Sequence, residues 1–132
     1  MRKEFQAPIS KLHLLATEDN ITYHETQLLR AACQASLKTG AIICSHITGD
    51  KAALQSAEIC EAEGLPLNRF AWFHANKAHE YQTLYSLGKK GVYLSLDYGK
   101  ETAELLLHLR TDGLWNKILV SMDSGWYNPR GG

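Results

Sequence analysis

Two histidines and two aspartates stand where short apolar runs of this sequence end. They are His46, His74, Asp97 and Asp123, and each follows a stretch rich in large apolar residues. Imidazole and carboxylate are the usual ligands of catalytic zinc, and they also suit manganese, cobalt and iron. Such a divalent metal lowers the pKa of a bound water to about 7. A carboxylate such as Asp123 could orient that water and accept its proton.

The apolar runs are typical of strands that are buried on both faces of a parallel sheet. We predict strands at residues 11–16, 41–46, 70–74, 92–97 and 118–123. Amphipathic helices are expected between them, at about residues 22–40, 50–64, 78–88 and 101–113. The strands begin about 22 to 30 residues apart, which is the spacing of βαβ units. The sequence therefore predicts an α/β fold of parallel βα repeats.

Local signals place the ends of these helices. Thr22 and Glu25 form a capping box, and Gly40 can end the helix that it begins. Asp50 is predicted to cap the second helix, and Gly88 to end the third.

Parallel strands share one direction, so the four strand-end residues are expected to converge on one rim. Each alone has a simpler interpretation: a histidine at the end of a buried strand is often structural, and an aspartate there often caps the next helix. Four together favour a shared site, because burying several ionisable groups is costly unless they pair or bind metal. Trp126 and Tyr127, just past Asp123, could line a substrate pocket or pack against the rim.

The remaining histidines are predicted to be solvated or to lie behind the ligands of a site, and the cysteines to be buried. His24 and His108 fall on predicted helices, and His79 lies near a helix start. The number of cysteines, three, is odd, and all three lie in apolar surroundings. No two of them form a Cys-x-x-Cys pair. This pattern favours buried, reduced thiols.

Charge and hydropathy exclude several classes of protein. Fourteen basic and fourteen acidic residues give a net charge of zero, so a nucleic-acid partner is not expected. No apolar run approaches the ~20 residues that span a bilayer, and no apolar segment follows the first charged residues as in a secretory signal. We expect a cytoplasmic protein without a membrane partner.

Several stretches together resemble one known family. They are LLRAACQASLKTG followed by AIICSHIT, then EAEGL, then FAWFHANKAHEYQTLYSLGKKGVYLSLDYGK, and finally ILVSMDSGWY. In these residues, which cover nearly the whole chain in order and spacing, the sequence resembles the phosphotriesterase family of the amidohydrolase superfamily. The resemblance implies a (β/α)8 barrel with a binuclear metal centre at the carboxyl ends of its strands. It also implies hydrolysis of phosphotriesters, lactones or other small-molecule esters by metal-bound hydroxide.

The resemblance also implies roles for single residues. His46 and His74 correspond to the metal-binding histidines that end the fifth and sixth barrel strands. Asp123 corresponds to the metal-binding aspartate that ends the eighth strand and serves in proton transfer. Asp97 corresponds to a pocket aspartate after the seventh strand.

The sequence departs from the family pattern in its first half. The His-x-His pair of the first barrel strand has no counterpart, because the resemblance begins near the fourth strand. A carboxylated lysine or a glutamate normally bridges the two metals on that strand. In the ungapped register Leu14 takes this place, with His13 adjacent as a possible metal contact and Lys11 three residues before.

A complete barrel takes ~250 residues, or 200 at the least, whereas this sequence has 132. We therefore expect residues 1–132 to form a single partial-barrel domain with about strands 4 to 8. Three interpretations follow: a fragment of a larger zinc-dependent ester hydrolase, a chain completed by a second copy or another chain, or a non-catalytic binding or interaction module. The first is favoured.

Overall fold

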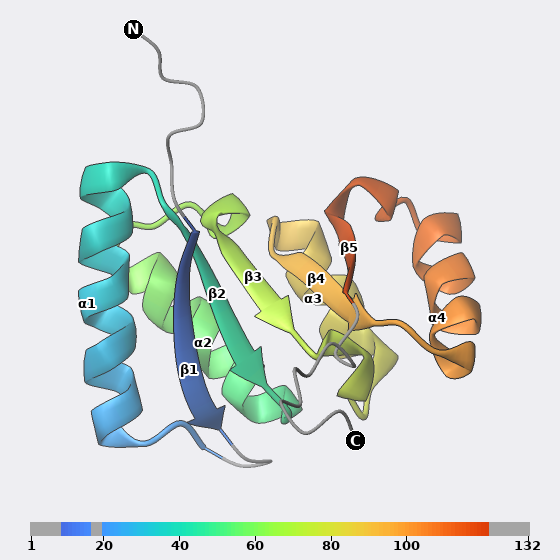
Figure 1. Cartoon of the computed structure of the whole chain (residues 1–132), viewed down its shortest axis with the longest axis horizontal. Coiled ribbons are helices and arrows are strands. Elements are labelled where there is room, and N and C mark those ends of the chain that lie inside the picture. The colour runs from blue at the N-terminus through green and yellow to red at the C-terminus, as the bar shows by residue number, and fades with distance from the viewer. Residues whose placement is uncertain (1–8, 17–19, 122–132) are drawn as a thin grey trace, which may run out of the picture.

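Five parallel strands form one sheet in the computed structural model of the chain, which describes the backbone of residues 9–16 and the whole of residues 20–121 (Figure 1). The strands are β1 (Ile9–Ala16), β2 (Ile42–Ile47), β3 (Phe70–Phe73), β4 (Tyr93–Asp97) and β5 (Ile118–Ser121). They lie side by side in the order in which they follow one another in the sequence. Every neighbouring pair is parallel. The predicted class of parallel βα repeats is confirmed.

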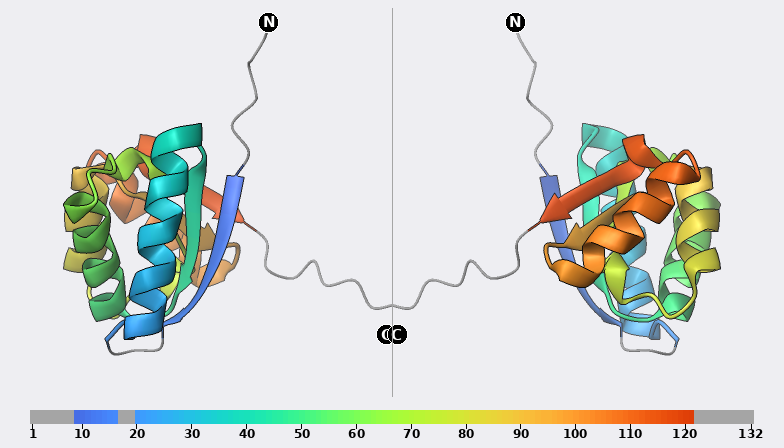
Figure 2. Two further views of the ribbon diagram at one scale, coloured as in Figure 1. Left: turned by 90° about the vertical axis from the view of Figure 1, so that its left-hand side faces the viewer. Right: turned by 90° about the vertical axis from the view of Figure 1, so that its right-hand side faces the viewer.

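A helix follows each of the first four strands. These helices are α1 (Tyr23–Thr39), α2 (Asp50–Ala62), α3 (Tyr81–Lys90) and α4 (Lys100–Thr111). Three short 3-10 turns complete the elements: η1 (Leu67–Arg69), η2 (Ala75–Lys77) and η3 (Trp115–Lys117). The side views show all four α-helices on the same face of the curved sheet (Figure 2). Sequential strand order with helices on one face is the arrangement of consecutive βα units in a barrel wall.

The core lies between the sheet and this helical layer. Neighbouring positions on paired strands, such as Ile43 beside Phe70, supply large side chains that are wholly buried. Trp72 is also buried, and its indole N–H donates to the carbonyl oxygen of Ile47 at 2.8 Å. Side chains alternate along a strand, so the residues between these face the opposite side of the sheet. His46 is one of those alternate residues and pairs in register with Phe73.

The predicted start and end of α1 are confirmed. Thr22 accepts a hydrogen bond from the backbone N–H of Glu25 at 3.1 Å, and the Glu25 carboxylate accepts from the N–H of Thr22 at 2.9 Å. Gly40 ends the helix in the left-handed conformation, with φ of 81°. Local sequence alone determines both ends, so the prediction needed no tertiary information.

The predicted bounds of α3 were wrong at both ends. The helix begins at Tyr81 and runs through Gly88 to Lys90, and Gly91 ends it with φ of 113°. Gly88 lies in a closely packed place: a Cβ there would lie 3.0 Å from a methyl group of Leu114. Two glycines three residues apart therefore have different roles, and only Gly91 adopts the backbone conformation that ends a helix.

The three free cysteines are buried, as the sequence predicted. Two of them lie in contact between neighbouring helices: the Sγ atoms of Cys33 on α1 and Cys60 on α2 are 3.7 Å apart. Contact with Cys33 and burial raise the pKa of the Cys60 thiol. No helix in residues 20–121 is long and apolar enough to cross a bilayer.

Asp50 caps a helix other than the predicted one. It is the first residue of α2, and the residue before it, Gly49, makes no side-chain cap. The Asp50 carboxylate instead accepts hydrogen bonds from the backbone N–H groups of His79 (2.7 Å) and Glu80 (3.0 Å), just before α3. Partial burial acts to raise the pKa of Asp50, but bonds from His79, the Thr83 side chain and Glu80 outweigh it and lower the pKa below its usual value.

We expect Asp50→Asn to lower the free energy of unfolding at pH 7 by about 1 kcal/mol, because it removes the negative charge from the start of α3. The pKa of Asp50 is lower in the folded state than in the unfolded state, where it is about 3.9, so its carboxylate stabilises the fold above about pH 3.9. This stabilisation is lost as the pH falls through the pKa of the folded state. The difference between wild type and Asp50→Asn should therefore shrink below about pH 4. Urea unfolding at several pH values measures it.

Glu58→Gln serves as the control, since Glu58 is an exposed carboxylate on the same helix. A difference between wild type and Asp50→Asn that stays constant from about pH 7 to pH 3 would refute the capping role.

Candidate functional site

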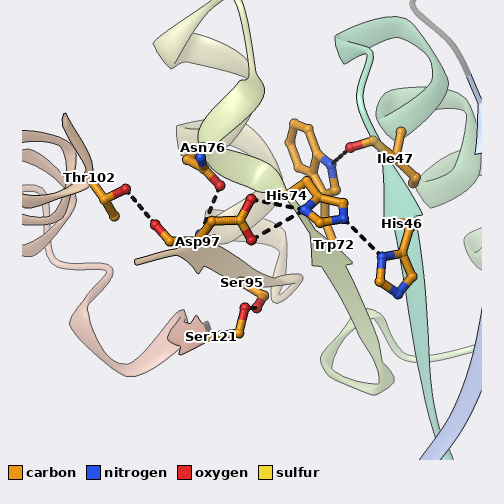
Figure 3. A network of polar contacts seen from close by, with 9 residues as sticks. All are labelled: His46, Ile47, Trp72, His74, Asn76, Ser95, Asp97, Thr102 and Ser121. Carbon is orange, nitrogen blue, oxygen red and sulfur yellow. Dashed lines mark hydrogen bonds and ion pairs between the residues drawn. The ribbon is translucent and has the colours of Figure 1, made fainter. Parts of the chain in front are cut away.

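Two imidazoles meet at the carboxyl end of neighbouring strands. His46 belongs to β2, and His74 directly follows β3. Nδ1 of His46 lies 3.0 Å from Nε2 of His74, and the ring planes are inclined by 53° (Figure 3). Both side chains lie on the rim that the strand directions predict. The structure thus brings together two residues that are separated by 28 positions in the sequence.

His74 has an unusual backbone. It adopts the left-handed conformation, with φ of 70° and ψ of 31°, and is the single non-glycine residue with positive φ in the part of the chain that the structure describes. For a non-glycine residue this conformation costs about 1–2 kcal/mol. It turns the chain out of β3 into η2, where the backbone N–H of Lys77 donates to the carbonyl oxygen of His74 at 3.0 Å.

A carboxylate holds the other nitrogen of His74. The two oxygen atoms of Asp97, the last residue of β4, lie 2.9 and 3.2 Å from Nδ1 of His74. Both side chains are largely buried, with 16% and 18% of their surface exposed. An ionised carboxylate only accepts hydrogen bonds, so Nδ1 of His74 must carry a proton. In the neutral ring Nε2 then presents its lone pair toward His46.

The backbone of Asp97 is itself fixed on two sides (Figure 3). Its N–H donates to Oδ1 of Asn76 in η2 at 2.9 Å. Its carbonyl oxygen accepts from the hydroxyl of Thr102 in α4 at 2.6 Å. Neither Asn76 nor Thr102 was predicted to be part of this site. The position of Asn76, two residues after a strand-end histidine, was the one local signal for it.

The two imidazoles fit a shared divalent metal. Two nitrogen ligands of a tetrahedral zinc, each bound at about 2.0–2.1 Å, lie about 3.3 Å apart. The facing nitrogen atoms are hydrogen-bonded at 3.0 Å, close to that separation, and a metal bound between them would displace the proton that the bond holds. The Asp97–His74 contact has the form of the outer carboxylate that commonly fixes a metal-binding imidazole. Among the described side chains no third His, Cys, Asp or Glu joins them to complete a metal site.

The other predicted site residues are only partly placed. Asp123, Trp126 and Tyr127 lie outside the described residues. His13 belongs to β1, within a register shift between Leu12, which pairs with Ser45, and Ala16, which pairs with Ile47. The backbone of His13 is therefore level with the end of β2 that carries His46.

The remaining histidines lie away from this pair, on helices or just before one. His108 on α4 stacks on the ring of Tyr81, with centroids 4.3 Å apart. His79 is 75% exposed and lies 3.5 Å from Asp50. His24 is an exposed residue of α1. All three are exposed, so the prediction that they are solvated is confirmed.

Comparison with known proteins identifies the family of the chain. The family model described as "Phosphotriesterase family" matches residues 9–128. The chain belongs to the phosphotriesterase family. The family that the sequence resembles is confirmed, and the matched residues include His46, His74 and Asp97.

Named relatives of this phosphotriesterase-family chain are similar over a limited part of their length. The "Phosphotriesterase homology protein" of Escherichia coli (strain K12) is 28% identical over 115 residues, which are 81% of this chain and 39% of that protein. The crystal structure of a lactonase from Listeria monocytogenes has a TM-score of 0.75 at 29% identity, over 86% of this chain and 37% of the lactonase.

A structure of the E. coli homology protein, complexed with phosphate in its active site, has a TM-score of 0.77 at 24% identity. The similarity covers 88% of this chain and 42% of the E. coli protein. The phosphotriesterase-family chain thus spans about two fifths of the length of these relatives, and its fold corresponds to part of theirs.

The Asp97–His74 contact predicts a single tautomer of His74. We expect Asp97→Asn to give a mixture of tautomers, because a carboxamide can offer either its N–H or its oxygen to Nδ1. Imidazole 15N chemical shifts of the metal-free protein at about pH 8, where histidine is normally neutral, measure the protonation of each nitrogen.

Asp112→Asn is the control variant, since the Asp112 carboxylate accepts from the hydroxyl of Tyr81 and serves another part of the fold. If Asp97→Asn kept Nδ1 fully protonated, Asp97 would not determine the tautomer.

Proposed function

We propose that this chain supplies part of the metal centre of a phosphotriesterase-family ester hydrolase. The observation that carries the proposal is the His46–His74 pair, whose facing nitrogen atoms lie 3.0 Å apart at the carboxyl ends of adjacent parallel strands. Family membership supports it, since the matched region contains both histidines. Active sites of parallel α/β barrels lie on this rim.

In this proposal, His46, His74 and Asp123 would hold a divalent metal, and His13 is a further candidate ligand. Zinc is the first choice for two imidazoles and a carboxylate, with manganese, cobalt and iron as alternatives. When bound, such a metal acidifies water and polarises the oxygen of an ester or phosphoryl group.

Residues of this chain then have distinct tasks. Asp97 holds the proton on Nδ1 of His74 and so leaves the lone pair of Nε2 available to a metal. Asp123 accepts a proton from the attacking water. Trp126 and Tyr127 would wall the substrate pocket, and Asp97 would border that pocket while acting through His74.

Lactones are the substrates to test first, because a Listeria monocytogenes lactonase is similar to this chain at 29% identity. Phosphotriesters and other small-molecule esters are the next class. Relatives extend well beyond the region that matches this chain. We therefore propose that the partial-barrel unit formed by residues 1–132 acts within a larger hydrolase, or with a complementing chain or second copy that supplies the rest of the barrel.

Metal analysis tests the proposal directly. Wild-type protein that is loaded with zinc and passed over a desalting column should retain the metal. We expect His46→Ala and His74→Ala each to weaken zinc binding more than about 100-fold, since even an outer partner of a zinc ligand contributes about 10–100-fold. A chelator competition measures the affinity, and hydrolysis of an activated lactone measures activity.

His79→Ala provides the matched control, because His79 is exposed and distant in role from the pair. Equal zinc affinity in wild type, His46→Ala and His74→Ala would contradict the proposal. A stable fold without any zinc binding would instead favour the non-catalytic binding module.

A further inference from the structure

Asn76 has a place in the fold that two otherwise similar asparagines do not share. Each of the three 3-10 turns has an asparagine at its middle position, namely Asn68 in η1, Asn76 in η2 and Asn116 in η3. η1 and η3 each lead into a strand, and their asparagines are exposed. η2 follows a strand, and its half-buried asparagine accepts a hydrogen bond from the backbone N–H of Asp97.

The side chain of Asn76 replaces a missing strand neighbour. The β3–β4 pairing ends with Phe73 beside Ser95, two residues before Asp97. On its other side Asp97 is still paired in register, with Ser121 of β5. Oδ1 of Asn76 therefore takes the hydrogen bond that a continuing β3 would otherwise have accepted. Without it, the backbone N–H of Asp97 would lose this partner on the β3 side.

These contacts form a closed ring that includes His74. The ring runs from His74 along the chain to Asn76, across to the backbone of Asp97, and through the Asp97 carboxylate back to Nδ1 of His74. The turn in which His74 has its left-handed backbone is part of this ring. Neither the turn nor the carboxylate can shift without breaking a hydrogen bond.

We infer that Asn76 is a positioning residue for His74, which it acts on through Asp97. By fixing the end of β4, it holds the carboxylate against Nδ1, and this keeps the lone pair of Nε2 directed toward His46. The inference rests on the proposed function for its consequence, zinc affinity. Its direct effect, the tautomer of His74, is a property of the metal-free protein.

Asn76→Ala removes the acceptor and tests the inference. We expect the amide of Asp97 to exchange with solvent faster, and the 15N shifts of His74 to show a mixture of tautomers. Zinc affinity, from competition with a chelator, should fall about 10-fold, the lower end of the effect of a direct outer partner, because Asn76 acts one contact further from the metal ligand. Asn76→Asp keeps an oxygen acceptor at the same place and should restore the single tautomer.

Asn116→Ala and Asn68→Ala are matched controls, with the same residue type at the same position of a 3-10 turn. They should leave the His74 tautomer and zinc affinity unchanged. If Asn76→Ala does not fold, Asn76→Ser, whose shorter side chain cannot reach as far, replaces it and carries the same expectations.

A folded Asn76→Ala protein with one His74 tautomer and zinc affinity within twofold of wild type would overturn the inference. Failure of the proposed function is distinguishable: wild-type protein would bind no zinc, while the imidazole shifts of the metal-free variants would still decide the role of Asn76.

Discussion

The pleat of the parallel sheet determines which residues of this chain can act chemically and which can only pack. Side chains alternate between the two faces of a strand. On one face, Ile43, Phe70 and Trp72 are sealed beneath the helices. The alternate positions carry His46 and Asp97. A shift of register by one residue would exchange these sets, so burial of the apolar set also fixes the polar one.

Much of this arrangement could be predicted from the sequence, because the signals are local. Short apolar runs that end in His46, His74 or Asp97 reveal both a buried strand and a polar residue at its carboxyl end. The capping box of Thr22 and Glu25 is complete within four residues and defines the start of α1. Parallel direction then brings the strand ends together without further information.

Features that depend on distant partners could not be predicted in the same way. Asp50 resembles the cap of its own helix but binds the amides before α3, about thirty residues away. Gly88 resembles a helix stop, yet its role is contact with Leu114. The role of Asn76 depends on its contact with the end of β4, which the local sequence does not reveal. In each case the residue type is compatible with two structural roles, and the tertiary neighbours determine which one it takes.

The segment between β3 and α3 is tied down at both of its ends. Asn76 joins its beginning to the end of β4, and the amides of His79 and Glu80 join its end to Asp50 at the start of α2. Such a doubly anchored segment has little freedom to open by itself, because release requires a helix start and a strand end to give way together. We therefore expect His74 to open only together with α2 and α3, as part of one cooperative unit.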